Sequence, residues 1–306
     1  MNEPRANAPK SPLTVDKTIL SKANALVAEW ADCLTPKGIR KHEMFFISGE
    51  RAVSETLELA PSLARSLFVC ADRHVPKLTK SVTQTSAQNF MSGGEPDARS
   101  AALQKLILRA REVTAANDPR FSVIALDRPI FELLDVSGTH APLLLARTPD
   151  VGDADLSKAP VGLEVLCALG DPSNVGALLR SAAAFGASKI ILLKECASPF
   201  HPKSVRAASA STLLTPFLRG PSIRDLSPMS EAGSLNGTIL ALDMHGKDLG
   251  TFVWPRNARL LIGEEGQGVP ASKTFEFLSI PMSREVESLN ATVAASIALY
   301  SYSKKA

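Results

Sequence analysis

The chain has 306 residues, of which 45% are hydrophobic and 21% charged, a composition typical of globular domains and a length that suits about two of them. A net charge of +3 and an aromatic content of 5% argue against a polybasic tail and against a continuous aromatic surface for stacking single-stranded nucleic acid. No apolar run reaches the ~18 residues of a membrane span, so we expect no membrane association and a cytoplasmic location.

The N-terminal half alternates between strand-like and helical patterns. Residues 1–13 are polar and predict a disordered leader, and residues 15–34 carry apolar side chains at helical spacing. The basic stretch 37–42 favours a solvated loop over a contact with RNA phosphates, although both interpretations stay open. Beyond it we predict strands at 44–48, 66–70, 121–126 and 142–146, helices at 51–59, 101–116 and 130–134, and a flexible insertion near 80–100. This pattern indicates a small α/β domain over residues 14–147.

A second α/β domain follows a candidate linker. Residues 148–160 contain two prolines, three aspartates and a glycine, which favours a linker. For residues 161–306 we predict strands at 162–169, 189–193, 238–242, 258–262 and 277–280, with helices at 175–185, 203–209 and 290–300. Strands that alternate with helices predict a mostly parallel sheet.

The first polar segment follows the first strand of this domain. Residues 171–187 read DPSNVGALLRSAAAFGA, in which Ser173 or Asn174 can cap a helix that carries Arg180 nearly two turns later. The N-terminus of a helix after a strand is a place where anionic ligands bind. Taken alone, the segment is better explained as a plain helix cap with a surface arginine.

Two further segments follow the last two strands. Residues 260–270 read LLIGEEGQGVP, and three glycines in six residues predict a loop with unusual backbone angles and close ligand approach. The loop lacks the Lys-Ser/Thr of a phosphate-binding P-loop and the GxGxxG of a dinucleotide site, and its two acids favour a cationic or hydroxyl-bearing ligand. In residues 280–290, IPMSREVESLN, Ser288 and Asn290 precede an alanine-rich helix. A tight turn and a capped core helix explain these segments individually.

In order, the three segments resemble the signature motifs of the SpoU/TrmH family of SPOUT RNA methyltransferases. The NxGxxxR pattern is met by Asn174, Gly176 and Arg180, and the glycine-glutamate loop by residues 263–268. The IPM…SLN element is met by residues 280–282 and 288–290. The resemblance covers about residues 161–302, and residues 46–53 look like the opening of the L30e-like substrate domain of this family, with Ser48 where an acid is common.

The resemblance implies a trefoil-knotted α/β domain, a homodimer with its interface beside the active site, an rRNA or tRNA substrate, and S-adenosyl-L-methionine as methyl donor without a metal. It implies cofactor contacts from the backbone and apolar surfaces of five residues: Leu242, Gly263, Ile280, Met282 and Leu289. It also implies a polar catalytic site around the ribose made of Asn174, Arg180, Glu264, Ser288 and Asn290.

The implied reaction is in-line attack of a ribose 2′-oxygen on the sulfonium methyl group. The family arginine is often described as the base, but a guanidinium keeps its proton far above neutral pH. We therefore expect Arg180 to stabilise the developing alkoxide and hold the adjacent phosphate, while the proton leaves to a phosphate oxygen or to water.

Two other function classes are less consistent with the sequence. An RNA-binding protein that has lost turnover is disfavoured by the presence of Asn174, Arg180 and Asn290. A nucleotide-binding oxidoreductase is disfavoured by the absence of GxGxxG. The four cysteines are far apart in sequence without metal-ligand spacing, which favours buried reduced thiols.

Overall fold

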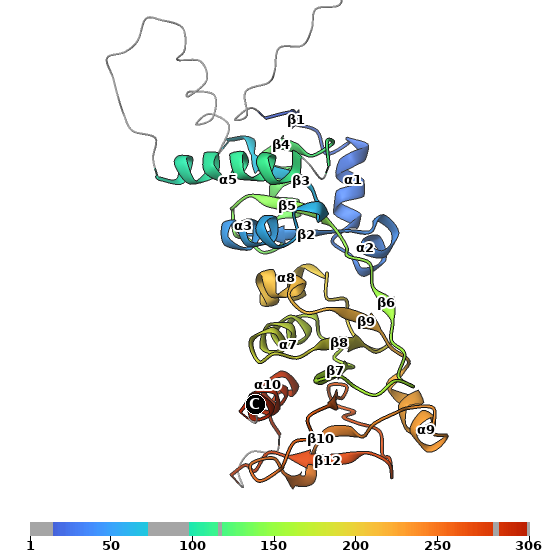
Figure 1. The fold of residues 1–306 in the computed structure, drawn as a ribbon. Helices are drawn as coiled ribbons and strands as arrows, with labels where there is room; N and C mark the ends of the chain where they lie inside the picture. The colour runs from blue at the N-terminus through green and yellow to red at the C-terminus, as the bar shows by residue number, and fades with distance from the viewer. Residues whose placement is uncertain (1–14, 73–97, 116–117, 284–287, 305–306) are drawn as a thin grey trace, which may run out of the picture. The chain divides into compact units, whose positions relative to one another are not determined.

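The computed structural model describes residues 15–72, 98–115, 118–283 and 288–304 and divides into two compact units, Met1–Thr148 and Pro149–Ala306 (Figure 1). The predicted leader and most of the predicted 80–100 insertion lie outside the described residues. Among the helices of the described ranges, none combines the length and apolar character needed to cross a bilayer.

The first unit is an α/β domain around a five-stranded sheet. The strand order is β1-β4-β3-β5-β2; β1, β4 and β3 run parallel, and β5 is antiparallel to both of its neighbours. Trp30 and Phe46 pack against Phe68 in the core. The strands are β1 (Lys17–Ile19), β2 (Met44–Ser48), β3 (Ala64–Cys70), β4 (Ser122–Leu126) and β5 (Leu143–Arg147). The helices are α1 (Ala25–Asp32), α2 (Pro36–His42), α3 (Glu50–Leu59), α5 (Ala98–Ala115), α6 (Arg128–Leu134) and the 3-10 helix η1 (Pro61–Leu63).

Two predictions for the start of this unit are wrong. The single helix expected over 15–34 is instead β1 followed by α1, because Asn24 caps the helix by accepting from the Leu26 N–H and β1 pairs with β4. The solvated loop expected over 37–42 is helix α2, which Thr35 caps by accepting from the Gly38 N–H. The identification of this unit as L30e-like stays a prediction.

The second unit contains a seven-stranded sheet in which every strand pairing is parallel, so the predicted mostly parallel sheet is confirmed. The strand order is β12-β10-β11-β7-β8-β9-β6. The strands are β6 (Gly152–Asp153), β7 (Leu163–Cys167), β8 (Lys189–Leu192), β9 (Phe217–Arg219), β10 (Ile239–Asp248), β11 (Ala258–Ile262) and β12 (Glu276–Ser279). The helices are α7 (Pro172–Ala184), α8 (Pro202–Ala208), α9 (Leu226–Glu231), α10 (Ala291–Ser303), η2 (Ser209–Leu213) and η3 (Ile223–Asp225).

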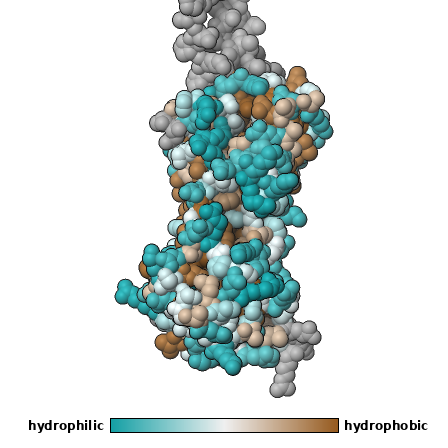
Figure 2. Space-filling model, turned by 90° about the vertical axis from the view of Figure 1, so that its right-hand side faces the viewer, coloured by the Kyte–Doolittle hydropathy of each residue, from teal (hydrophilic) through white to brown (hydrophobic). Residues whose placement is uncertain are grey.

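The helices cover the sheet on both sides. Helix α7 packs between α8 and α10 (Figure 1), while Ile223 of η3 and Leu226 of α9 join a separate apolar cluster with alternate residues of the strands. The stretch 148–160, which we predicted to be a linker, contains β6 and Leu156, and Leu156 is buried in that cluster. Hydrophilic side chains predominate on the face drawn in Figure 2, as expected when each unit buries its apolar residues inside.

Candidate functional site

The three polar segments meet because of the strand order. Strands β7, β11, β10 and β12 are adjacent and parallel, so their carboxyl ends lie along one edge of the sheet. The turn into α7 follows β7, the glycine loop follows β11, and the segment that leads to α10 follows β12. The carboxyl edge of a parallel sheet is the usual place for ligand binding.

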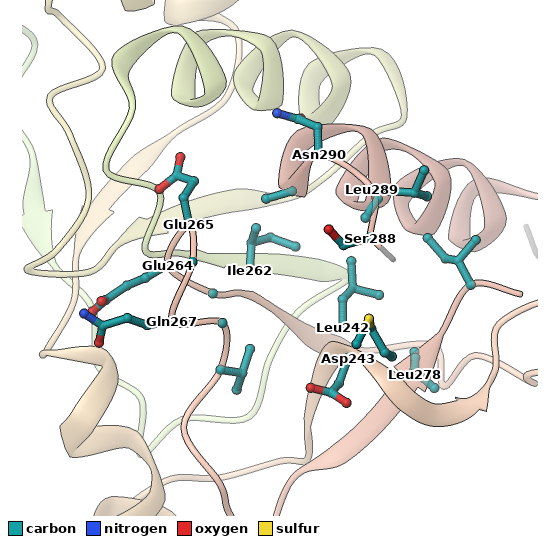
Figure 3. Close-up of a pocket in the computed structure, with 18 of the residues that line it drawn as sticks. Leu242, Asp243, Ile262, Glu264, Glu265, Gln267, Leu278, Ser288, Leu289 and Asn290 are labelled. Carbon is teal, nitrogen blue, oxygen red and sulfur yellow. The ribbon is translucent and has the colours of Figure 1, made fainter. Parts of the chain in front are cut away.

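A cavity of about 500 Å³ opens at this edge (Figure 3). All five residues predicted to contact the cofactor line it, as do three of the predicted catalytic residues, Glu264, Ser288 and Asn290. Asn174 and Arg180 do not line it. The walls are largely apolar, and the full lining is Leu242, Asp243, Met244, Ile262, Gly263, Glu264, Glu265, Gly266, Gln267, Gly268, Val269, Leu278, Ile280, Met282, Ser288, Leu289, Asn290, Ala291 and Ala294.

The glycine loop is a closed turn. The Glu264 N–H donates to the Gly268 carbonyl at 3.0 Å, and the Gly268 N–H donates back to the Glu264 carbonyl at 2.9 Å. Gly266 and Gly268 have φ angles of 84° and 69°, in the left-handed region that favours glycine. A Cβ on Gly263 would lie 2.4 Å from the backbone of Gly268. The spacing of the glycines therefore follows from the shape of the turn.

Glu265 joins the glycine loop to the start of α7. Its carboxylate accepts hydrogen bonds from the Gly170 N–H at 2.7 Å, from the Asp171 N–H at 3.2 Å and from Asn174 Nδ2 at 3.1 Å. Partial burial raises the pKa of Glu265, but the hydrogen bonds from Gly170 and Asn174 outweigh it and lower the pKa overall. Glu265 is therefore a charged acceptor at neutral pH that fixes the loop against the first segment.

Asn290 extends this chain of contacts to α10. Its Nδ2 donates to Asn174 Oδ1 at 3.1 Å, while its Oδ1 caps α10 by accepting from the Thr292 and Val293 N–H groups. Thr292 Oγ1 donates to the Asn174 carbonyl at 3.1 Å. The predicted residues Asn174 and Asn290 thus contact each other directly, across 116 residues of sequence.

Two predicted catalytic residues point elsewhere. Arg180 is exposed on α7, and its side chain forms no ion pair or hydrogen bond with the described residues. Glu264 forms an ion pair with Arg224 at 3.3 Å, and its side chain points away from Leu242 and Ser288 (Figure 3). The structure therefore brings Glu264, Ser288 and Asn290 to the cavity lining, places Asn174 in contact with Asn290, and leaves Arg180 outside the site.

Glu265, Arg224 and Asp243 also lie at or beside the site, although no sequence pattern predicted them. Glu265 stands beside Glu264 in the same motif, and only the turn geometry shows which acid faces α7. Arg224 and Asp243 lie outside the three motifs, so no sequence signal singled them out. In the part of the chain that the structure describes, no group of three or more His, Cys, Asp or Glu side chains could hold a metal ion.

Comparison with known proteins matches the same part of the chain that forms the site. Residues 164–300 match the model of the SpoU rRNA Methylase family. The chain is 34% identical over 289 residues to "Ribosomal RNA small subunit methyltransferase G 2" of Syntrophobacter fumaroxidans, covering 94% of this chain and 49% of that protein. It is 28% identical to the Bacillus subtilis 23S rRNA (guanosine(2553)-2'-O)-methyltransferase RlmP, covering 93% and 98%.

The chain spans about half to three-fifths of the length of the first curated relatives it matches. Its fold is similar to that of an AdoMet-bound rRNA methyltransferase from Sinorhizobium meliloti, with a TM-score of 0.68 and 20% identity, covering 94% of this chain and 97% of the other. This likeness confirms the predicted α/β fold class with a mostly parallel sheet.

Proposed function

We propose that the chain is a member of the SpoU rRNA methylase family, whose model residues 164–300 match, and that it transfers a methyl group from S-adenosyl-L-methionine to a ribose 2′-hydroxyl of ribosomal RNA. One observation carries the proposal: the second and third motif segments line one cavity, and the first is tied to them by the contacts Glu265–Asn174–Asn290. An rRNA substrate is favoured over tRNA by the 23S rRNA relatives. Such a substrate would also agree with the cytoplasmic location that we predicted.

The cavity fits the proposed cofactor. About 500 Å³ lies within the range of small-molecule sites. Leu242, Leu278 and Leu289 give it apolar walls, and Asp243 and Glu265 add negative charge at its edge (Figure 3). Apolar walls suit the purine, and acidic side chains suit a cationic sulfonium. When bound, S-adenosyl-L-methionine supplies an electrophilic methyl group.

The polar residues around the cavity would orient the ribose. Asn174 and Asn290 hold each other through one hydrogen bond, and Ser288 lines the cavity beside them. Groups held this rigidly can position a hydroxyl for in-line attack, which is the main contribution that the chain can make to an already activated methyl donor. Arg180 would stabilise the negative charge on the 2′-oxygen.

The exposed position of Arg180 supports a homodimer with shared sites. Val293, Ile297 and Tyr300 lie at positions i, i+4 and i+7 of α10 and are 48%, 37% and 49% exposed, which makes an apolar stripe on the helix next to α7. We propose that a second copy of the chain covers this stripe, so that Arg180 of one copy reaches the cavity of the other.

A basic surface supports RNA as the partner. Lys203 and Arg206 are exposed on α8, which crosses α7 where Gly176 meets Ser204, one turn before Arg180. Lysine and arginine side chains bind phosphate oxygens and so fix the register of a nucleic acid. This surface would hold the RNA backbone on either side of the target ribose.

The test is transfer of a radiolabelled methyl group from S-adenosyl-L-methionine to rRNA by the full chain, with mapping of 2′-O-methyl sites. Arg180→Ala should abolish transfer and leave cofactor affinity nearly intact. Cofactor and RNA binding without any transfer by the wild-type chain would contradict the proposal and favour the non-catalytic RNA-binding alternative.

Mixing variants tests the shared site. Arg180→Ala and Ile280→Glu, the latter disrupting the cavity, should each be inactive alone. A mixed dimer should regain part of the activity if Arg180 acts on the cavity of the other copy. No recovery in a verified mixed dimer would contradict this arrangement.

A further inference from the structure

Arg224 of η3 holds the glycine loop from outside the cavity. Its Nη2 donates to Gln267 Oε1 at 3.2 Å, and its Nη1 lies 3.3 Å from Glu264 Oε1. Glu264 and Gln267 point to the same side of the loop, away from Leu242 and Ser288 (Figure 3). One guanidinium therefore contacts both side chains. Its planar fork of donors allows this arrangement, whereas a single ammonium group does not.

Glu195 fixes the position of Arg224. The Glu195 carboxylate accepts hydrogen bonds from the Ser222 hydroxyl and from the Ile223 N–H at 3.0 Å, and its Oε1 lies 3.4 Å from Arg224 Nη1. Ser222 also caps η3, with Asp225 completing the capping box. Arg224 thus extends from a segment whose backbone is held independently of the loop.

Glu264 depends on this contact. Its side chain is only 16% exposed, and its Oε1 has no hydrogen-bond partner among the described residues, so the guanidinium of Arg224 is the charge that faces it. A mostly buried carboxylate is costly without such a partner. Loss of Arg224 would therefore push Glu264 toward water and move the loop with it.

The loop is held on both sides. Glu265 connects it to Gly170 and Asn174 on the α7 side, and Arg224 connects it to η3 on the other. Between these attachments, residues 263–269 line the cavity. We infer that Arg224 is a positioning residue that keeps the glycine loop in its binding conformation and so sets the affinity of the cavity for S-adenosyl-L-methionine.

This inference rests on the proposed function for the identity of the ligand, but a first test does not require the ligand. Hydrogen exchange of residues 260–270 is measured on the full chain without cofactor. R224Q should speed exchange of the Glu264 and Gly268 N–H groups, which pair across the turn. Unchanged exchange in R224Q would overturn the inference.

The second test is the affinity for S-adenosyl-L-methionine, measured by calorimetry. R224Q should weaken binding about three- to tenfold, since an exposed network of charges is worth roughly 1 kcal/mol. R224K should be intermediate, because it keeps the charge but loses the fork. In turnover, KM for S-adenosyl-L-methionine should rise while KM for RNA stays the same.

R219Q is the matched control. Arg219 is 61% exposed, against 59% for Arg224. It lies on β9 and pairs at 2.9 Å with Asp153, which lies outside the glycine loop. R219Q should change neither the hydrogen exchange of the loop nor the affinity for S-adenosyl-L-methionine.

An affinity of R224Q within twofold of wild type would overturn the inference. Failure of wild type to bind the cofactor would instead contradict the proposed function and leave the exchange test to decide on Arg224. If R224Q does not fold, R224M, which also removes the charge, replaces it in both tests with the same thresholds.

Discussion

Arg259 lies on β11 with its side chain 2% exposed, and it connects the sheet to the start of the second unit. Its Nε donates to Glu164 Oε2 at 2.9 Å, and its Nη atoms donate to the carbonyls of Lys158 at 2.7 Å and of Leu156 and Asn236. Arg259→Leu would fill much of the same space but would leave a 4% exposed carboxylate on Glu164 and several carbonyls without a donor.

Breaking a buried pair by removing one partner costs about 3–5 kcal/mol. We expect the lower end here, ~3 kcal/mol, because Lys189 Nζ remains 3.2 Å from Glu164 Oε1. For a unit of this size the loss corresponds to a Tm decrease of roughly 6–12 °C.

Differential scanning calorimetry of the full chain checks the prediction, with the transition of the second unit followed separately. Arg219→Leu is the control, because Arg219 and Asp153 also lie 2.9 Å apart but are 61% and 82% exposed. An exposed pair contributes about 0–1 kcal/mol, so its Tm should change little. Equal effects of the two variants would refute the argument from burial.

Three further predictions follow from titration and charge. Because the folded pKa of Glu265 is below the ordinary 4.5, it contributes stability that is present above pH 4.5 and is lost as pH falls through the folded pKa. Glu265→Gln should flatten the dependence of Tm on pH in acid, and an unchanged profile would contradict this. Lys203→Glu with Arg206→Glu should raise KM for RNA about tenfold and reduce its salt dependence, with cofactor affinity constant; an unchanged KM would exclude α8 as an RNA contact. Burial raises the pKa of Cys33 to about 11, so iodoacetamide at pH 8 should modify it about a hundredfold more slowly in the native chain than in urea, and equal rates would show that Cys33 is accessible.

The sequence predicted elements well where the physical signal is continuous. Strands β2 and β11 have the predicted bounds, 44–48 and 258–262, because each is made mostly of apolar residues, with only Ser48 in β2 and Arg259 in β11 as exceptions. Strands β6 and β9 were not predicted, since two or three residues carry no periodicity. The prediction of one helix over 15–34 did not take account of Asn24, which caps α1 and so decides where this helix begins.

The candidate site was also predictable in part. Motif order predicted which segments meet, and parallel strands bring them to one edge. Individual side-chain directions were not predictable: Glu264 and Glu265 are neighbours, yet one faces Arg224 and the other faces Asn174. That choice depends on the backbone of the turn, where Gly266 and Gly268 have positive φ angles. Cys167 and Cys196, 29 residues apart, have their Sγ atoms 3.5 Å from each other, a contact that spacing alone does not indicate.

Gly176 has a consequence for how the NxGxxxR motif is interpreted. A Cβ at this position would lie 2.2 Å from the Ser204 carbonyl oxygen and 2.7 Å from the Ala207 Cβ, so the glycine permits helices α7 and α8 to cross. The motif therefore combines a glycine that helix packing requires, Gly176, with two residues that we propose act at the site, Asn174 and Arg180. A protein engineer who grafts Asn174 and Arg180 onto another scaffold would need to reproduce the helix crossing as well, because the three-residue gap between Gly176 and Arg180 sets where the arginine emerges relative to α8.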